Sequence, residues 1–458
     1  MTGLALARAL AGTAFAAVAS LALAQTTTYP NVAKTTDGTA QSTENFDYGV
    51  CHGTDPSCYH NWGIARQKKV LLFTRTAGPR HQSLGTALPL GLDPALGPDN
   101  HTQMDMIRLL NAEGIAVDYT ETVTNLSNLD QYGAVIFFSN SRDVLWDHGR
   151  AVNPAYAVST TTSAYLDQAK VLLRQYMRDG GGFVAIHNAH GTEYNWPWYE
   201  GLLGNSNYYS HGPFQLGTYH VLSSDSSTDP IGPPGTAVTF TDEWYNLVPF
   251  PTDVKFLAAV DDSTLAGKDS GHPGFPNFHP IAWCQYYDGG RAWITTLGHD
   301  LRDTEDLSTA SAPWPGGAEF QKLIVNGIKS AMGLQPFCTT YAFTGFIAPI
   351  VNAPGFNAAS AGSSVRISFG LGGNQGTSPF TVTSTPISCL TGLPTSTGPF
   401  DPPTPVDIDY DGGTQLYHFD WKTQGSWANS CRELLVTVND GTIRKANFQL
   451  RGGQGHDD

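Results

Sequence analysis

Residues 180–190 read GGGFVAIHNAH, and this stretch predicts the fold of the larger part of the chain. A glycine turn leads into a short apolar run, and His187 and His190 follow where that run ends. The preceding residues 165–179 carry apolar side chains at helical spacing, which predicts a helix before the turn. In an open α/β sheet, ligands bind beyond the carboxyl ends of the strands. His187 is therefore placed for chemistry, with a hydrogen-bonded core histidine as the alternative.

The flanking segments repeat this alternation of strand and helix. We predict strands at residues 70–74, 117–119, 132–139, 254–260, 281–286 and 291–296, and further helices at 101–113 and 320–332. The pattern indicates an α/β domain over residues 68–335, with a mostly parallel sheet and helices on both faces. Residues 337–455 differ, because short β-branched runs alternate there with glycine-rich turns. They predict an all-β sandwich domain.

The N-terminus has the features of an export signal. Residues 1–24 combine a positive flank at Arg8, an apolar run and the small residues Ala22 and Ala24 at the expected cleavage site, so we expect a signal peptide. Residues 25–67 then form a polar extension with a small cysteine loop. The mature protein is expected to be secreted or periplasmic.

Cysteine usage agrees with export, since an even count of six favours disulfides. Cys51 and Cys58 lie close enough in sequence to pair locally, and Cys389 and Cys431 are expected to pair within the C-terminal domain. Pairing of the remaining two, Cys284 and Cys338, is a guess by elimination.

Charge and missing motifs exclude several classes of function. The net charge of −15 argues against nucleic acid as a partner, and no segment after residue 24 has the length of an apolar membrane span. Neither a phosphate-binding loop, nor a dinucleotide-binding glycine motif, nor the serine elbow of a hydrolase is present. We therefore expect no nucleotide cofactor.

Histidines follow several of the predicted strands. His81 lies in the loop after residues 70–74, His187 ends the central strand, and His299 follows residues 291–296. If these strands are parallel, the three side chains converge at one edge of the sheet. Asp242 and Glu243 are candidates to join them. Such a cluster can bind Zn²⁺ or another divalent metal through the three histidines, or it can act as a general acid and base without a metal.

Aromatic residues near the histidines suggest a sugar site, because sugar rings pack on aromatic faces. Tyr194, Trp196 and Trp198 are the expected platform, with a buried packing cluster as the alternative. The other expected substrate contacts are His190, His211 and Tyr245.

Five stretches of the α/β domain resemble the trehalose-utilisation (ThuA-like) family. They are KKVLLFTRTAGPRHQSL, GGGFVAIHNAHGTEYNWPWYEGLLG, the His211 segment, TDEWYNL and HPIAWCQYYDGGRAWITTLGHD. The resemblance implies the class I glutamine amidotransferase-like fold, a flavodoxin-like doubly wound sheet, and a role in sugar catabolism. His187 stands where amidotransferases carry a nucleophilic cysteine, so thiol-based glutamine hydrolysis is not expected. His299 resembles the place of the amidotransferase histidine.

The C-terminal domain resembles the PxKF domain of exported bacterial proteins. The likeness rests on YAFTGFIAPIVNAPGFN, GLGGNQG and FDWKTQGSWANSCRELLVTVNDGTIRKANFQL, although SVRISF stands where the naming motif is expected.

Together the features of the whole sequence predict an exported enzyme (a hydrolase, lyase or isomerase) that acts on a carbohydrate. The alternative is a non-catalytic protein that binds glycans or attaches to the cell surface.

Overall fold

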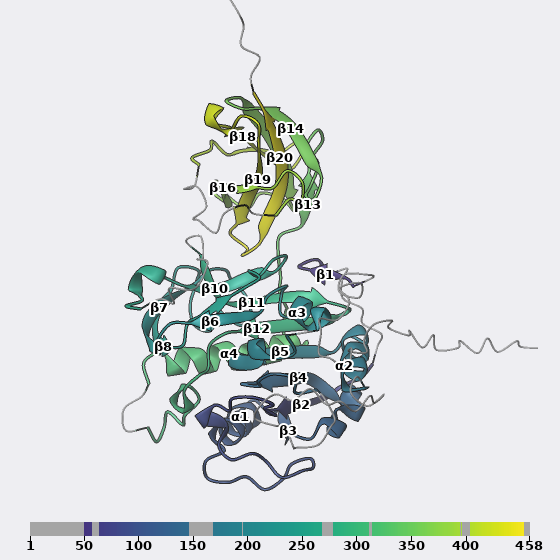
Figure 1. Ribbon diagram of the computed structural model, residues 1–458, viewed down its shortest axis with the longest axis vertical. Coiled ribbons are helices and arrows are strands. Elements are labelled where there is room, and N and C mark those ends of the chain that lie inside the picture. The colour runs from purple at the N-terminus through teal and green to yellow at the C-terminus, as the bar shows by residue number, and fades with distance from the viewer. Residues whose placement is uncertain are drawn as a thin grey trace, which may run out of the picture.

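The computed structural model describes residues 50–56, 64–145, 168–194, 196–267, 278–310, 314–393, 395 and 404–452. The predicted signal peptide, most of the N-terminal extension and Cys58 lie outside these residues, and so does the expected pairing of Cys58 with Cys51. Figure 1 shows a larger α/β part and, above it, a smaller part built from strands. None of the helices in the described ranges has the length and apolar character needed to cross a membrane.

A ten-stranded sheet forms the centre of the larger part. Its strands are β1 (His52–Gly53), β2 (Gln67–Phe73), β3 (Ala116–Thr120), β4 (Tyr132–Phe138), β5 (Gly182–Ile186), β7 (Gln215–Val221), β8 (Ala237–Asp242), β10 (Lys255–Val260), β11 (His279–Tyr287) and β12 (Gly290–Thr295). They follow the order β3-β2-β4-β5-β12-β11-β10-β7-β8, with β1 beside β11. A separate two-stranded sheet pairs β6 (Tyr208–His211) with β9 (Tyr245–Leu247).

The sheet is mixed, which corrects the expectation of a mostly parallel one. Strands β3, β2, β4, β5 and β12 are parallel, whereas every pairing from β12 through β11, β10 and β7 to β8 is antiparallel. Only Asp288 and Gly289 separate β11 from β12, and a connection of two residues can join only antiparallel strands. The strands that precede the three predicted histidines all belong to the parallel half.

Helices cover both faces of the parallel half. Side chains of α1 (His101–Ala112) and α4 (Gly317–Ala331) share one core cluster, and those of α2 (Gln168–Arg178) and α3 (Pro197–Leu202) share the other. Both β4 and β5 are buried along their whole length, as expected of strands covered on two faces. In the stretch that decides the fold, Gly182 leaves room for α4, because a Cβ there would overlap the carbonyl oxygen of Ala331.

The smaller part consists of two four-stranded sheets that enclose one core. Its strands are β13 (Phe343–Phe346), β14 (Phe356–Ser360), β15 (Ser364–Leu371), β16 (Phe380–Ile387), β17 (Asp409–Asp411), β18 (Leu416–Lys422), β19 (Ser430–Val438) and β20 (Ile443–Arg451). The sheets have the orders β13-β15-β18-β17 and β14-β20-β19-β16, and the Cys389–Cys431 disulfide lies within this part. Phe369, Trp421 and Phe448 are fully buried between the sheets.

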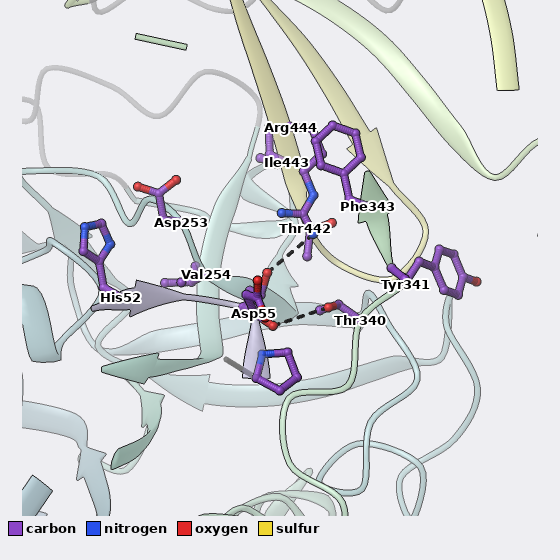
Figure 2. Close-up of a pocket in the computed structure, with 14 residues that line it drawn as sticks. His52, Asp55, Asp253, Val254, Thr340, Tyr341, Phe343, Thr442, Ile443 and Arg444 are labelled. Carbon is purple, nitrogen blue, oxygen red and sulfur yellow. Dashed lines mark hydrogen bonds between the residues drawn. The ribbon is translucent and has the colours of Figure 1, made fainter. Parts of the chain in front are cut away.

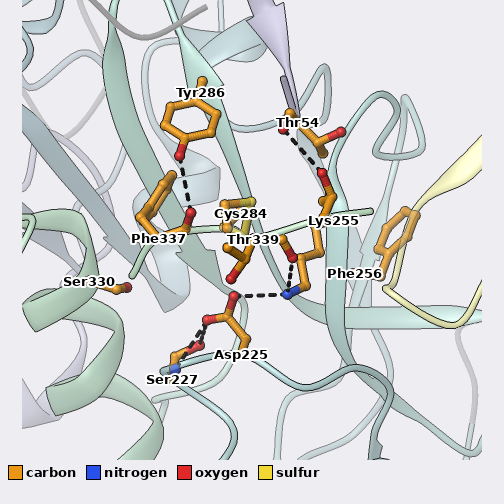
Figure 3. Close-up of a disulfide and its surroundings, with 12 residues drawn as sticks. Thr54, Asp225, Ser227, Lys255, Phe256, Cys284, Tyr286, Ser330, Phe337 and Thr339 are labelled. Atoms are coloured by element: carbon orange, nitrogen blue, oxygen red, sulfur yellow. Dashed lines mark hydrogen bonds and ion pairs between the residues drawn. A yellow bond between two sulfur atoms is a disulfide. The ribbon is translucent and has the colours of Figure 1, made fainter. Parts of the chain in front are cut away.

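The segment after α4 is fixed to the α/β part by buried contacts (Figure 3). A disulfide joins Cys338 to Cys284 of β11. Next to it, the fully buried Lys255 of β10 donates a hydrogen bond of 2.8 Å to the carbonyl oxygen of Thr339 and forms an ion pair of 3.0 Å with Asp225. The connection to the β-sandwich is therefore packed against the sheet rather than strung out as a linker.

Candidate functional site

Three predicted histidines meet at the carboxyl edge of the parallel strands. His81 lies in the loop after β2, His187 follows β5 directly, and His299 follows β12. The ring centroid of His81 lies 4.7 Å from that of His187 and 5.3 Å from that of His299. The two Nε2 atoms of His81 and His187 are 3.1 Å apart. The strand order accounts for this convergence, since β2, β4, β5 and β12 are parallel neighbours.

The ring of His187 is held in one orientation. Its backbone has a φ of 53°, in the left-handed region that residues with a Cβ rarely adopt and that is often found at functional sites. Because a carbonyl oxygen only accepts hydrogen bonds, Nδ1 must donate the bond of 2.9 Å to the carbonyl oxygen of Thr296. That leaves Nε2 with a lone pair facing His81 and the hydroxyl group of Tyr245, which lies 2.9 Å away.

A carboxylate completes the cluster. Glu243 lies in the short turn between β8 and β9, and its Oε2 atom is 3.1 Å from Nδ1 of His299. The same oxygen is 3.6 Å from Nε2 of His211 and 3.8 Å from Nε2 of His187. The side chains of His299 and His211 are 31% and 33% exposed, so solvent reaches the cluster from this side.

Asp242 has a different role from its neighbour Glu243. Its side chain is fully buried and accepts hydrogen bonds of 2.8 Å from the amide of Gly298 and 2.7 Å from the amide of Glu243. Burial raises the pKa of Asp242 to about 7, against the effect of these hydrogen bonds. The carboxyl group thus supports the turn before His299, and of the two carboxylates it is Glu243 that supplies a potential ligand atom to the cluster.

Electrostatics favour neutral imidazoles at two of the three positions. Burial, with a smaller contribution from His299, lowers the pKa of His81 to about 4. Burial and the neighbouring histidines hold the pKa of His187 well below its usual value. For His299, burial lowers the pKa, but the hydrogen bond and charge of Glu243 outweigh it, and the net shift is upward.

These four side chains have the composition of a metal site. One potential ligand atom from each of His81, His187, Glu243 and His299 lies within 4.8 Å of all the others. With Zn–N bonds of about 2.0–2.1 Å, ligand atoms on a tetrahedral zinc ion lie roughly 3.3 Å apart. The His81–His187 and His299–Glu243 distances, both 3.1 Å, are close to that value. Metal-binding histidines also usually donate their second ring nitrogen, as His187 does to Thr296.

Comparison with known protein families shows to which family the chain belongs. The family model described as trehalose utilisation, ThuA, matches residues 69–329. The chain belongs to the ThuA family. All four side chains of the cluster fall within the ThuA match, and the match suggests a role related to sugar metabolism. No match to a curated protein was found.

Two of the aromatic residues expected to bind sugar do not reach the histidine cluster. Trp196 and Trp198 are 2% and 1% exposed and stack on each other in the core. Trp198 donates a hydrogen bond to Asp288, and Lys170 lies over the ring of Trp196. The alternative of a buried packing cluster was correct for both tryptophans, because α3 turns them toward α2 rather than toward the strand ends.

His190 is also a core residue in the ThuA domain. It is fully buried, its ring lies 5.3 Å from that of Trp283, and burial lowers its pKa to about 3. It is therefore not available to a substrate in this structure. Tyr194 is only half-buried and lies near Tyr208 and Tyr245, so it stays close to the cluster.

Two aromatic residues that the sequence did not single out lie at the rim of the histidine cluster. Phe214 is 38% exposed, and its ring lies 5.2 Å from that of His299. The ring of Trp314 is nearly parallel to that of Phe214, at an angle of 9° and a centroid distance of 6.3 Å. Phe214 comes three residues after His211, and that proximity was the only sequence signal for it. Trp314 lies far away in sequence, and nothing local marked it.

Proposed function

We propose that this protein is an exported ThuA-family enzyme that acts on a carbohydrate at a metal centre formed by His81, His187, His299 and Glu243. The observation that carries the proposal is the convergence of four ligand atoms within 4.8 Å of one another, on a strand edge where α/β proteins bind ligands. Burial keeps His81 and His187 neutral, which is the state in which imidazole binds a metal. Zn²⁺ is the first candidate for such a nitrogen-rich set.

A metal ion held by these ligands would supply a Lewis acid and an activated water, and hydrolysis, elimination and isomerisation of sugars can all use them. The chain's own groups would complete the reaction site. The side chain of Tyr245 is buried, but its hydroxyl group lies 2.9 Å from Nε2 of His187, so it is placed to pass a proton within the cluster. His211 lies next to Glu243 on the exposed side and is placed to exchange a proton with a substrate. Phe214, Trp314 and Tyr194 would pack against the sugar ring.

One observation favours a second mechanism at the same site. The pKa of His299 is raised mainly by its hydrogen bond and charge interaction with Glu243, which opposes the effect of burial. A histidine and a carboxylate paired in this way can share a proton near neutral pH and act as general acid and base without a metal. This mechanism keeps the same residues but predicts activity in the presence of a chelator.

Several features support the assignment to the exported class. Two disulfides are present among the described residues, and disulfides persist in oxidising compartments. We propose that residues 1–24 are removed as a signal peptide, that residues 68–335 form the ThuA domain, and that residues 337–455 form an accessory domain of the PxKF type.

The decisive experiment is elemental analysis of the purified mature protein, together with its His81→Ala, His187→Ala and His299→Ala variants. We expect about one equivalent of a transition metal in the parent protein and its loss in all three variants. His220→Ala, on β7 and outside the cluster, is the matched control and should keep the metal. A folded parent protein that contains no metal and cannot be loaded with Zn²⁺ would overturn the metal centre and leave the acid–base mechanism.

Activity is then measured on a panel of disaccharides that includes trehalose, with and without chelator. Turnover that is lost with the chelator and restored by Zn²⁺ supports the proposal. Saccharide binding without turnover in the metal-loaded protein would instead favour the non-catalytic alternative.

A further inference from the structure

A second cavity lies at the junction of the two parts of the molecule, and the ThuA match does not explain it. It has a volume of about 590 Å³ and is lined by three separate segments: residues 52–56, Asp253 with Val254, and residues of the β-sandwich with its connection. Figure 2 shows His52 and Asp253 on one side, Arg444 and Phe343 on the other, and Asp55 between them. We propose that this junction pocket binds a neutral sugar unit of a glycan.

The junction pocket and the histidine cluster lie in different places on the sheet. Strand β1 pairs with Tyr286 and Tyr287, and Tyr287 lies opposite Gly290 at the start of β12. His299, in contrast, follows the end of β12. The pocket and the cluster are therefore located toward opposite ends of one strand, and the pocket cannot be a subsite of the metal centre.

Arg444 supplies hydrogen-bond donors that the protein uses only in part. Its Nε atom is buried and has no hydrogen-bond partner among the described residues. One terminal nitrogen reaches Thr54 Oγ1 at 3.5 Å, the outer limit for a hydrogen bond, and the guanidinium lies over the ring of Phe343 at 4.9 Å. An arginine fixed against an aromatic ring with donors to spare is suited to binding oxygen atoms of a ligand.

The charges around Arg444 restrict the class of ligand. Asp55, Asp253 and Asp440 all lie near enough to interact electrostatically with the guanidinium, and the first two line the pocket. A phosphate or sulfate would meet more negative than positive charge, and a metal cation would meet the arginine. A neutral polyol avoids both penalties, because its hydroxyl groups donate to carboxylates and accept from the guanidinium.

Size and shape agree with this choice. Small-molecule sites commonly occupy roughly 300–1,000 Å³, and they combine aromatic surface with a few polar groups. Phe343 and Tyr341 provide aromatic surface in the pocket, and both side chains are half-buried. Since the three segments come together only when the β-sandwich is docked, sugar binding here would require both parts of the chain.

The test uses the full mature chain with His187→Ala, so that the metal centre cannot contribute turnover, and the probes are trehalose, maltose, cellobiose and chitobiose. Isothermal titration calorimetry measures the affinity for each. Arg444→Met removes the guanidinium but keeps the length of the side chain. Asp253→Asn is the second variant, and asparagine tolerates the φ of 58° at this position. Arg451→Met, exposed at the other end of β20, is the matched control.

We expect at least one of these saccharides to bind, and each pocket variant to weaken that binding tenfold or more while the control leaves it unchanged. Binding that neither pocket variant alters would overturn the proposal, as would a folded chain that binds none of the four. The proposal does not depend on the metal centre, because a metal-free protein could still bind sugar at the junction and a metalloenzyme could lack this second site.

Discussion

The Nε2 atoms of His81 and His187 lie 3.1 Å apart although 106 positions separate the two residues in the sequence. Since Nδ1 of His187 donates to Thr296, its Nε2 atom carries a lone pair toward His81. Two imidazole nitrogens at this distance need a proton or a cation between them. In the absence of a metal, a neutral His81 supplies the proton by donating from Nε2. Because burial keeps both rings uncharged, a metal ion can take the place of that proton when His81 adopts the other tautomer.

Glu243→Gln should weaken metal binding while it preserves the fold. The substitution keeps the shape of the side chain but removes the negative charge next to His299. We expect the dissociation constant for Zn²⁺ to rise by about 10–100-fold or more, with the thermal midpoint of the metal-free protein nearly unchanged. Competition with a chromogenic chelator measures the constant. Unaltered affinity would remove Glu243 from the ligand set.

Tyr245→Phe should separate chemistry from metal binding. The hydroxyl group 2.9 Å from Nε2 of His187 is lost, while the ring that packs on His187 and Tyr208 remains. We expect kcat to fall about 100-fold or more, as when a positioned proton donor is removed, with metal content preserved.

Tyr219→Phe is the control for this change. The hydroxyl group of Tyr219 is buried in β7 without a hydrogen-bond partner among the described residues, so its removal should leave both activity and metal content intact. If Tyr245→Phe also retains full kcat, the Tyr245 hydroxyl has no part in proton transfer.

Phe214→Ala tests the aromatic rim. The ring lies beside His299 and is partly exposed, so its loss should remove packing against the sugar without disturbing the ligands. We expect KM for the best saccharide substrate to rise about 10-fold, which corresponds to about 1.4 kcal/mol of binding energy, and kcat to change little. Leu216→Ala, on the same segment and 53% exposed, should change neither constant. A KM that stays constant in both variants would place the sugar elsewhere.

Gly441→Ala tests the docking of the two parts. Gly441 accepts a hydrogen bond of 2.8 Å from the amide of Phe256 in β10, has a φ of 89°, and is so close that a Cβ would overlap the carbonyl oxygen of Phe256. The substitution should separate the β19–β20 turn from the α/β part, at a cost of about 1–3 kcal/mol.

Limited proteolysis measures this separation. We expect faster cleavage between residues 333 and 342 in Gly441→Ala than in the parent chain. Gly412→Ala, in a turn where a Cβ would meet no atom within 4 Å, is the control and should be cut at the parent rate. Equal cleavage of all three proteins would mean that the contact of Gly441 with β10 contributes nothing to docking.

The convergence of histidines was predictable because it depends on short-range signals. Each apolar run predicts a strand, and each of the three histidines follows such a strand. Parallel strands bring their carboxyl ends together at one edge of the sheet. Glu243 could not be distinguished from Asp242 in this way. Successive residues near a strand end point in opposite directions, and only the actual end of β8 at Asp242 shows which of them is buried under the turn before His299.

The aromatic residues show where sequence reasoning fails. Trp196 and Trp198 are near His187 in sequence but are turned into the core by α3, whereas Phe214 and Trp314 meet beside His299 although about one hundred residues separate them. Their meeting depends on how the antiparallel half of the sheet is arranged, whereas the sequence pattern predicts a mostly parallel sheet. Residues 193–242, where the sequence predicts no strand, contain β6, β7 and β8.

Strand β12 begins near the junction pocket and ends just before His299, a run of six residues or roughly 20 Å. If a polysaccharide binds at the junction pocket, the histidine cluster would therefore reach a sugar unit several positions away along the same polysaccharide, or a unit of a neighbouring polysaccharide molecule. Retention on an insoluble material and turnover of it would then be separate properties of this protein. Each could be lost or improved by mutation without the other, and the protein would remain on its substrate between catalytic events.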